Sequence, residues 1–135
     1  MRNPIRSVRW TNDGVAGGPD SIAILLAWLI GGNNYARWRS GDDKDELYRE
    51  ILAEFTRHGI THRERSEVNL RLCLLQVSFN SAVEYLQAKL EPQRGIPLSE
   101  ARVSARVLRI CPYWDLQVQF MEVGPCPPSP LQITS

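Results

Sequence analysis

The stretch that decides the fold is residues 62–90, which read HRERSEVNLRLCLLQVSFNSAVEYLQAKL. Apolar side chains recur along it in alternating steps of four and three residues: Val68, Leu72, Leu75, Phe79, Ala82 and Leu86. This repeat places them on one face of an α-helix. We therefore predict a helix from about His62 to Leu90 whose stripe faces a core. Leu74, Val77 and Tyr85 add a second apolar side, so we expect two neighbouring elements to pack against this helix.

The segment just before this helix carries both stop and start signals. Gly59 suits the left-handed residue that ends a helix, and apolar Ile60 follows it. Thr61 and Glu64 fit a capping box, in which the hydroxyl and the carboxylate each accept from the other residue's amide. These signals predict a helix-turn-helix joint at residues 58–64.

Two earlier helices are expected upstream of that joint. The first begins around Pro19 to Ser21 and ends at Gly31 and Gly32, with Ile22, Leu25, Leu26 and Leu29 on its apolar face. The second begins at Asp42 or Asp43, where acids suit the positive end of a helix, and carries the stripe Tyr48, Ile51, Leu52 and Phe55. Residues 33–41 are expected to be a polar and aromatic link. Residues 1–18 are expected to be an arm and loop whose Trp10 docks on the domain.

Helical signals also continue downstream of residue 91. A helix starting at Ser99 would carry an apolar stripe at Val103, Val107 and Ile110, with Arg102, Arg106 and Arg109 together on the opposite side. Tyr113, Trp114, Leu116 and Phe120 fit one further short helix. We therefore divide the chain into an arm (1–18), a helical domain (19–91), a helical extension (92–123) and a proline-rich tail (124–135).

The charge and the apolar runs of the chain exclude some classes of protein. The 135 residues include 16 Lys and Arg against 15 Asp and Glu, for a net charge of +1. This balance excludes a polybasic tail and makes global charge an unsuitable basis for binding. The charge is uneven, because residues 1–40 hold five arginines and only two acids. The longest apolar run, residues 22–30, is far shorter than the roughly 20 residues that span a membrane.

The sequence shows no catalytic or metal-binding constellation. It lacks a nucleophile with a histidine base, a phosphate-binding loop and a metal-binding histidine motif. We therefore expect a protein that is not an enzyme and needs no metal or cofactor. The three cysteines, Cys73, Cys111 and Cys126, match no zinc spacing, which favours an intracellular, reduced protein.

The polar face of the 62–90 helix suggests a nucleic-acid contact. With Val68, Leu72 and Leu75 turned inward, the exposed face is expected to present side chains able to read base edges, namely Arg65, Asn69 and Gln76. Further arginines would contact phosphates: Arg63 and Arg71 beside that face, Arg37 and Arg39 on the link, and Arg2, Arg6 and Arg9 on the arm. The alternative is an ordinary solvated face of a helical bundle.

Several segments resemble a Myb/SANT-like domain of the trihelix-like kind found in fungal and oomycete proteins, many of them transposon-derived. These are Trp10 before the first helix, Leu25-Leu26-Ala27-Trp28, the link GNNYARW (32–38), Gly59-Ile60 before Arg63, and Tyr85. The segment CPYWDL (111–116) is similar to a downstream element of that group. The resemblance implies an all-α, three-helix helix-turn-helix bundle with a long third helix and a C-terminal helical extension.

The same resemblance implies a function. Its first implication is a nuclear DNA-binding module of a transcription factor or a transposon-derived protein, with helix 62–90 at the DNA. A SANT-type protein-interaction module is the alternative, possibly a homodimer formed through the 99–110 helix and the Tyr113/Trp114 region. A third reading is an orphan or effector-like helical protein without DNA binding.

Overall fold

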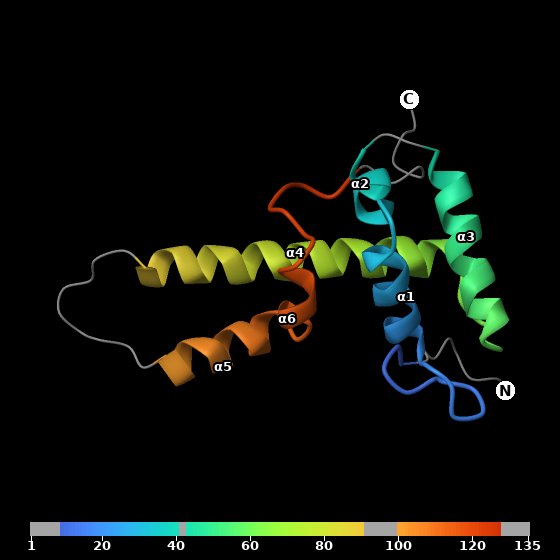
Figure 1. Cartoon of the computed structure of the whole chain (residues 1–135), viewed down its shortest axis with the longest axis horizontal. Helices are drawn as coiled ribbons and strands as arrows, with labels where there is room; N and C mark the ends of the chain where they lie inside the picture. Colours follow the sequence, from blue (N-terminus) through green and yellow to red (C-terminus); the bar gives the residue numbers. More distant parts are fainter. Residues whose placement is uncertain (1–8, 41–42, 91–99, 128–135) are drawn as a thin grey trace, which may run out of the picture. The chain divides into compact units, whose positions relative to one another are not determined.

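The computed structural model describes residues 9–40, 43–90 and 100–127, and every regular element in these ranges is a helix (Figure 1). The helices are α1 (Ser21–Ile30), α2 (Asn34–Arg39), α3 (Lys44–Arg57), α4 (Arg65–Leu90), α5 (Glu100–Ile110) and α6 (Trp114–Gln117). The all-α prediction is therefore confirmed. The chain forms two compact units, Met1–Val68 (unit 1) and Asn69–Ser135 (unit 2), and the boundary between them falls inside α4.

In unit 1, α1 packs against α2 and α3. Helix α1 begins after Asp20, whose Oδ1 accepts a hydrogen bond from the Ala23 amide at 3.0 Å, and it ends at Gly31 as the sequence predicts. Leu25 and Leu29 of α1 are almost fully buried. Trp10 docks edge-on against Phe55 of α3 with the ring centres 5.8 Å apart, so the docking expected of Trp10 is confirmed.

Helix α2 replaces the irregular link that the sequence predicts for residues 33–41. Tyr35 and Trp38 are buried in unit 1 and hold the short helix against its neighbours. Lys44 closes its C-terminal end, because Nζ donates to the carbonyl oxygens of Trp38 at 2.5 Å and Ser40 at 2.9 Å. Six residues are too few to show a helical repeat, which is why the pattern did not reveal α2.

Helix α3 begins and ends as the sequence indicates. The Asp43 carboxylate caps its first turn by accepting from the Asp45 amide at 3.0 Å. At the other end the Ile60 amide donates to the Phe55 carbonyl at 2.9 Å, and Gly59 has φ +85°, the left-handed conformation that glycine adopts without strain. A side chain at residue 59 would also lie only 3.1 Å from Val15 Cγ1.

Helix α4 begins at Arg65, three residues later than predicted. The predicted capping box at Thr61 and Glu64 is wrong, because both residues precede the helix. The carboxylate that reaches back is that of Glu67, whose Oε1 accepts from the Glu64 amide at 2.9 Å. Residues 61–64 stay outside the helix, and Arg63 among them enters a buried polar network described below.

In unit 2, α6 lies against the middle of α4. Phe79 of α4 and Trp114 stack with ring centres 5.4 Å apart, and Gln117 Nε2 donates to the Leu75 carbonyl at 2.9 Å. The predicted short helix near Tyr113 to Phe120 is thus confirmed as α6. Helix α5, orange in Figure 1, leads into it with Val107 buried. The domain limits expected from the sequence stay a prediction. The two compact units meet at a different position, between Val68 and Asn69.

Candidate functional site

Arg63 is the centre of a buried network in unit 1. Its guanidinium lies 4.4 Å from the centre of the Trp10 ring, and the side chain is only 1% exposed. Nη2 donates to Asp13 Oδ2 at 2.9 Å, Nε to Ser21 Oγ at 3.0 Å and Nη1 to Glu67 Oε2 at 3.1 Å. The expectation that Arg63 flanks an exposed face is therefore wrong, because its charge is neutralised inside the unit.

Asp13 is the acid that balances this arginine. Its carboxylate accepts from the Ser21 amide at 2.7 Å, from the Ser21 hydroxyl and from His62 Nε2 at 3.1 Å. Burial alone would raise the pKa of Asp13, but the hydrogen bonds from Ser21 and Arg63 outweigh it and the pKa is lowered. The network ties the loop at residues 9–13, the first turn of α1 and the segment before α4 into one structure.

The two arginines of α2 also have partners within unit 1. Arg37 forms a two-pronged pair with Glu50 of α3, with contacts of 2.8 and 3.1 Å, and donates to Asn34 Oδ1 at 2.7 Å. The hydrogen bond from Arg37 holds the pKa of Glu50 below its ordinary value. Arg39 donates to the Tyr35 hydroxyl and lies 5.5 Å from the centre of that ring.

The residues expected to read bases on α4 are not gathered on one open face. Arg65 pairs with Asp45 and lies 5.2 Å from the centre of the Tyr48 ring, although its side chain is 47% exposed. Asn69 and Arg71 are half-buried. Gln76 is fully buried, so the expectation that it is exposed is wrong. Its Nε2 donates to Asn80 Oδ1 and to the Glu122 carbonyl, both at 2.9 Å.

The arm residues complete the predicted set. Arg9 is exposed, and its backbone carbonyl accepts from Arg63 Nη2 at 3.2 Å. Arg2 and Arg6 lie outside the described residues. The arginines expected to form one contact surface are thus mostly engaged with carboxylates and aromatic rings of unit 1.

A stripe of exposed apolar side chains runs along α4 in unit 2. Leu70 is 59% exposed, Leu74 45% and Val77 51%. The expectation that Leu74 and Val77 are covered by a second neighbour is therefore wrong; Tyr85 is half-buried. The stripe repeats the four-three spacing of the buried residues Val68, Leu72 and Leu75, each of which lies two positions earlier along the helix. We call Leu70, Leu74 and Val77 the α4 stripe.

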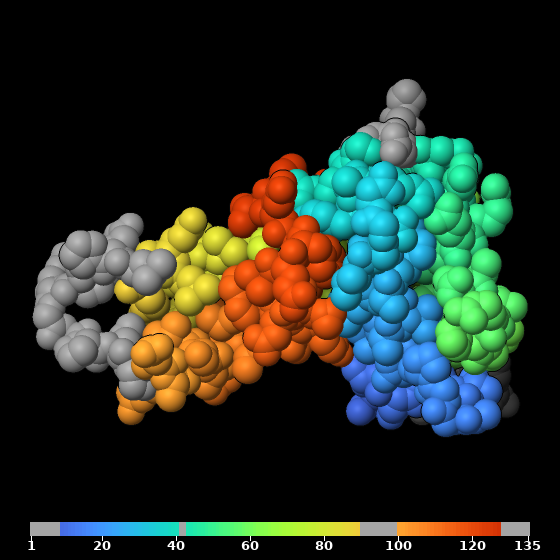
Figure 2. Space-filling model, in the orientation of Figure 1, coloured from blue at the N-terminus to red at the C-terminus, as the bar shows by residue number. Residues whose placement is uncertain are grey.

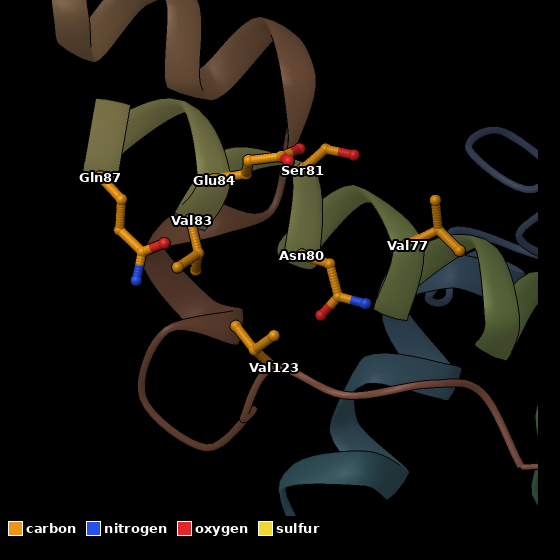
Figure 3. A pocket seen from close by; sticks show the side chains of 7 residues that line it. All are labelled: Val77, Asn80, Ser81, Val83, Glu84, Gln87 and Val123. Atoms are coloured by element: carbon orange, nitrogen blue, oxygen red, sulfur yellow. The ribbon is translucent and has the colours of Figure 1, made fainter. Parts of the chain in front are cut away.

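A groove of about 390 Å³ opens beside the C-terminal end of the stripe (Figure 3). It is lined by α4 and by the segment that follows α6, through Val77, Asn80, Ser81, Val83, Glu84, Gln87 and Val123. Asn80 Nδ2 donates to the Gly124 carbonyl at 2.8 Å and, with the buried Gln76, holds residues 122–124 along α4. The valines give the groove an apolar lining, and Asn80, Glu84 and Gln87 add polar groups.

Two thiols lie near each other where the chain continues past this groove. Cys126 Sγ contacts the Cys73 carbonyl oxygen at 3.5 Å. Burial, together with the neighbouring Cys126 thiol, raises the pKa of Cys73 to about 12, so this thiol stays protonated at neutral pH. Burial likewise raises the pKa of Cys111. Cys73 and Cys111 therefore behave as packing residues rather than nucleophiles.

Helix α5 carries the second open surface of unit 2. Arg102, Arg106 and Arg109 are all exposed, as is Leu108 at 42%. In the space-filling view much of α5, in orange, is open (Figure 2). Val107 is buried on the inward side, and Val103 and Ile110 are half-buried there. Sequence reasoning noted these arginines but did not select them as a site.

Tyr113 and Trp114, expected to form a dimer contact, are half-buried, and Trp114 stacks on Phe79 within unit 2. Among the described residues there is no group of three or more His, Cys, Asp or Glu side chains placed to hold a metal ion. Within the same ranges, no helix combines the length and apolar character needed to cross a membrane.

Comparison with known proteins gives no relative. No family model, curated protein or solved structure matches the chain. The resemblance to Myb/SANT-like domains therefore stays an expectation from the sequence, and the function rests on the surfaces described above.

Proposed function

We propose that this chain is a non-enzymatic protein-interaction module that pairs with a second copy of itself through the α4 stripe. The observation that carries the proposal is the exposure of Leu70, Leu74 and Val77 at the spacing of a helix–helix contact. Sustained apolar spacing on one face of a helix is normally covered, and exposed patches of this kind mark interaction sites.

A second copy suits this stripe because the stripe is self-complementary. When two α4 helices run antiparallel with Leu74 near the symmetry axis, Leu70 of one copy lies beside Val77 of the other. Such a contact uses the same patch on both chains, as two-fold dimers do. Charge does not oppose it, since Arg71 is the one charged residue between positions 70 and 77.

The apolar surface of the stripe limits the affinity expected for the dimer. A dimer would cover six apolar side chains, three from each copy, and each is about half exposed in the single chain. At roughly 1.5–3 kcal/mol for each fully buried side chain, covering them contributes about 5–9 kcal/mol. Association opposes this with roughly 4–15 kcal/mol of lost freedom. The largest net gain that these two terms allow is about 5 kcal/mol, so the dimer is expected to be weak, with a dissociation constant of about 0.2 mM or higher.

Sedimentation equilibrium tests the proposal over protein concentrations from about 50 µM to about 2 mM, a range that extends on both sides of the tightest expected constant. The wild-type chain should show a reversible monomer–dimer equilibrium, and Leu74→Glu should be monomeric. Ile30→Glu is the matched control, because Ile30 of α1 is 47% exposed and lies in unit 1. Circular dichroism verifies that both variants are folded. A wild-type chain that stays monomeric throughout, or equal effects of the two variants, would overturn the proposal.

DNA binding is the second candidate function. It is supported by the exposure of Arg9 and by the half-exposed Arg65 in the first turn of α4. An electrophoretic mobility shift with a duplex library at low salt tests it, since phosphate contacts weaken steeply as salt rises. A salt-sensitive shift that Arg65→Glu and Arg9→Glu abolish would support DNA binding; a folded protein that gives no shift would exclude it.

A further inference from the structure

The arginines of α5 form a ridge on one side of the helix. Arg102, Arg106 and Arg109 are spaced by four and three residues and are exposed, while Val107 is buried on the inward side. The residues three and four positions from Arg106 are the two arginines Arg102 and Arg109 and the apolar Val103 and Ile110. None of them is a carboxylate. Within α5, no Asp or Glu therefore lies one turn from Arg106 or Arg109.

Several arginines of unit 1 lie beside a carboxylate. In unit 1, Arg37, Arg57, Arg63 and Arg65 each pair with a carboxylate. Like charges one turn apart destabilise a helix. Arg106 makes two such pairs, so an oppositely charged partner on this face would remove a repulsion that the isolated helix carries.

An apolar seam lies directly beside the ridge. Ala101, Ala105 and Leu108 each precede one of the three arginines, repeat the same four-three spacing, and are exposed. Two alanines allow another helix to approach closely, and Leu108 supplies a larger apolar contact. In paired helices, charged residues that flank an apolar strip determine which partner binds. A strip flanked by arginines therefore favours a helix whose apolar strip is flanked by acids.

We infer that the exposed face of α5, formed by Ala101, Ala105, Leu108 and the adjacent Arg106 and Arg109, binds an acidic amphipathic helix of another protein. Apolar residues of that helix would cover the seam, and its Glu or Asp side chains would pair with the ridge. This surface is separate from the α4 stripe, so the inference goes beyond self-association.

A second copy of this chain is a poorer match for the ridge. The acidic helix of the chain is α3, and its Asp45, Glu50 and Glu54 already pair with Arg65, Arg37 and Arg57. Using them across an interface would break those pairs. The fourth acid of α3, Glu46, would supply only one further charge, so we place the complementary acids on a different protein.

Nucleic acid is also a poorer match. Three arginines would neutralise about three phosphates, whereas duplex-binding proteins commonly make about 6–10 phosphate contacts. A sugar-phosphate backbone would also leave Leu108 and the two alanines without apolar contacts. The seam thus favours a protein helix over a nucleic acid backbone.

Fluorescence anisotropy with a labelled synthetic helix tests the inference. The probe carries Leu at its a and d positions and Glu at its e and g positions, and the full-length chain is titrated into it. We expect saturable binding that weakens with salt, and a loss of at least about tenfold in affinity for the double variant Arg106→Glu/Arg109→Glu. Leu108→Ser should also weaken binding while leaving its salt dependence in place.

The matched control is Arg9→Glu/Arg49→Glu, which makes the same change in net charge at two exposed arginines of unit 1. Its affinity should stay within about twofold of wild type. Repeating the titration in the Leu74→Glu background separates this surface from the dimer, because monomeric protein should bind the probe equally well. Circular dichroism verifies helix content, and Arg106→Gln/Arg109→Gln provides a second, milder test if the glutamate variant is unstable.

Three results would overturn the inference. The first is absence of probe binding by the wild-type protein at low salt. The second is an equal loss of affinity in the ridge and control variants, which would mean that net charge alone attracts the probe. The third is binding of a 20-base-pair DNA duplex that depends on Arg106 and Arg109 while the acidic helix does not bind, which would assign the ridge to nucleic acid.

Discussion

Unit 1 and unit 2 use the same residue types in opposite ways. In unit 1, several arginines that look like surface contacts in the sequence are turned inward or paired, as Arg63 is with Asp13 and Arg37 is with Glu50. In unit 2, Arg106 and Arg109 of α5 and the leucines of the α4 stripe are exposed. The contrast teaches that charged and apolar side chains contribute to the packing of the first unit, whereas in the second several of them are exposed, as the proposed contacts require.

Arg63→Met should have the largest effect, because it removes the cation from the network and leaves Asp13 buried with its charge. We expect a loss of about 3–5 kcal/mol in the free energy of unfolding, measured by urea denaturation. Arg57→Met is the control, since the exposed Arg57–Glu54 pair should contribute little to stability. Equal losses in the two variants would show that the network does not stabilise unit 1.

The acid side of the same network predicts a pH dependence. The pKa of Asp13 lies below its ordinary value of 3.8 in the folded chain, so its stabilisation is complete above that value and is lost as the pH falls through the lowered pKa. Asp13→Asn should be less stable than wild type by about 1.5–3 kcal/mol at pH 7, and the gap should narrow as the pH falls below 3.8 and through the lowered pKa. Urea titrations at pH 7, 5 and 3 measure it; a gap that does not change with pH contradicts this assignment.

In unit 2 the buried amide of Gln76 should contribute more to stability than the exposed side chain of Gln87 at the groove. Gln76→Ala leaves the Glu122 carbonyl and the Asn80 amide oxygen without this donor, which should cost about 1–3 kcal/mol of stability. Gln87→Ala, at an exposed position that lines the groove, should change stability by less than about 0.5 kcal/mol. Thermal unfolding of both variants checks the difference, and similar shifts in Tm would argue against a structural role for Gln76.

The smallest effect should have the opposite sign. Arg106→Glu replaces two repulsions on α5 with two attractions, to Arg102 and Arg109, and should stabilise the chain by about 0.8–2 kcal/mol. Arg37→Glu, which breaks the pair with Glu50, should instead destabilise it. Parallel urea titrations compare the two. If Arg106→Glu destabilises the fold, the ridge has a structural role in unit 2 and the contrast between the units fails.

Periodic patterns predicted the long elements of the fold. The limits of α1, the left-handed Gly59 and the burial of Val68, Leu72, Leu75 and Phe79 all follow from local signals. Helix α2 did not follow, because its stability comes from contacts distant in sequence, such as Arg37 with Glu50. The start of α4 was misplaced because Arg63 serves a network with Asp13 that no local pattern encodes.

The candidate site was harder to predict than the fold. Gln76 was expected to be exposed and is buried, while Leu74 was expected to be buried and is exposed. Both errors have one cause: polar and apolar residues alternate around α4, so helical spacing alone does not indicate which side is covered. The partners of Gln76, at Asn80 and Glu122, come from the fold of unit 2 rather than from the neighbouring sequence.

The proposal that the chain self-associates through unit 2 and not through unit 1 is tested most directly by nitrogen-15 NMR spectra of the full chain over a dilution series. Amides that shift with concentration should cluster at residues 70–77 of α4, while those of α1, α2 and α3 keep their positions. The Leu74→Glu variant should show no such shifts. Concentration-dependent shifts centred on unit 1, or spectra that do not change up to the highest concentration, would contradict the assignment of binding to unit 2.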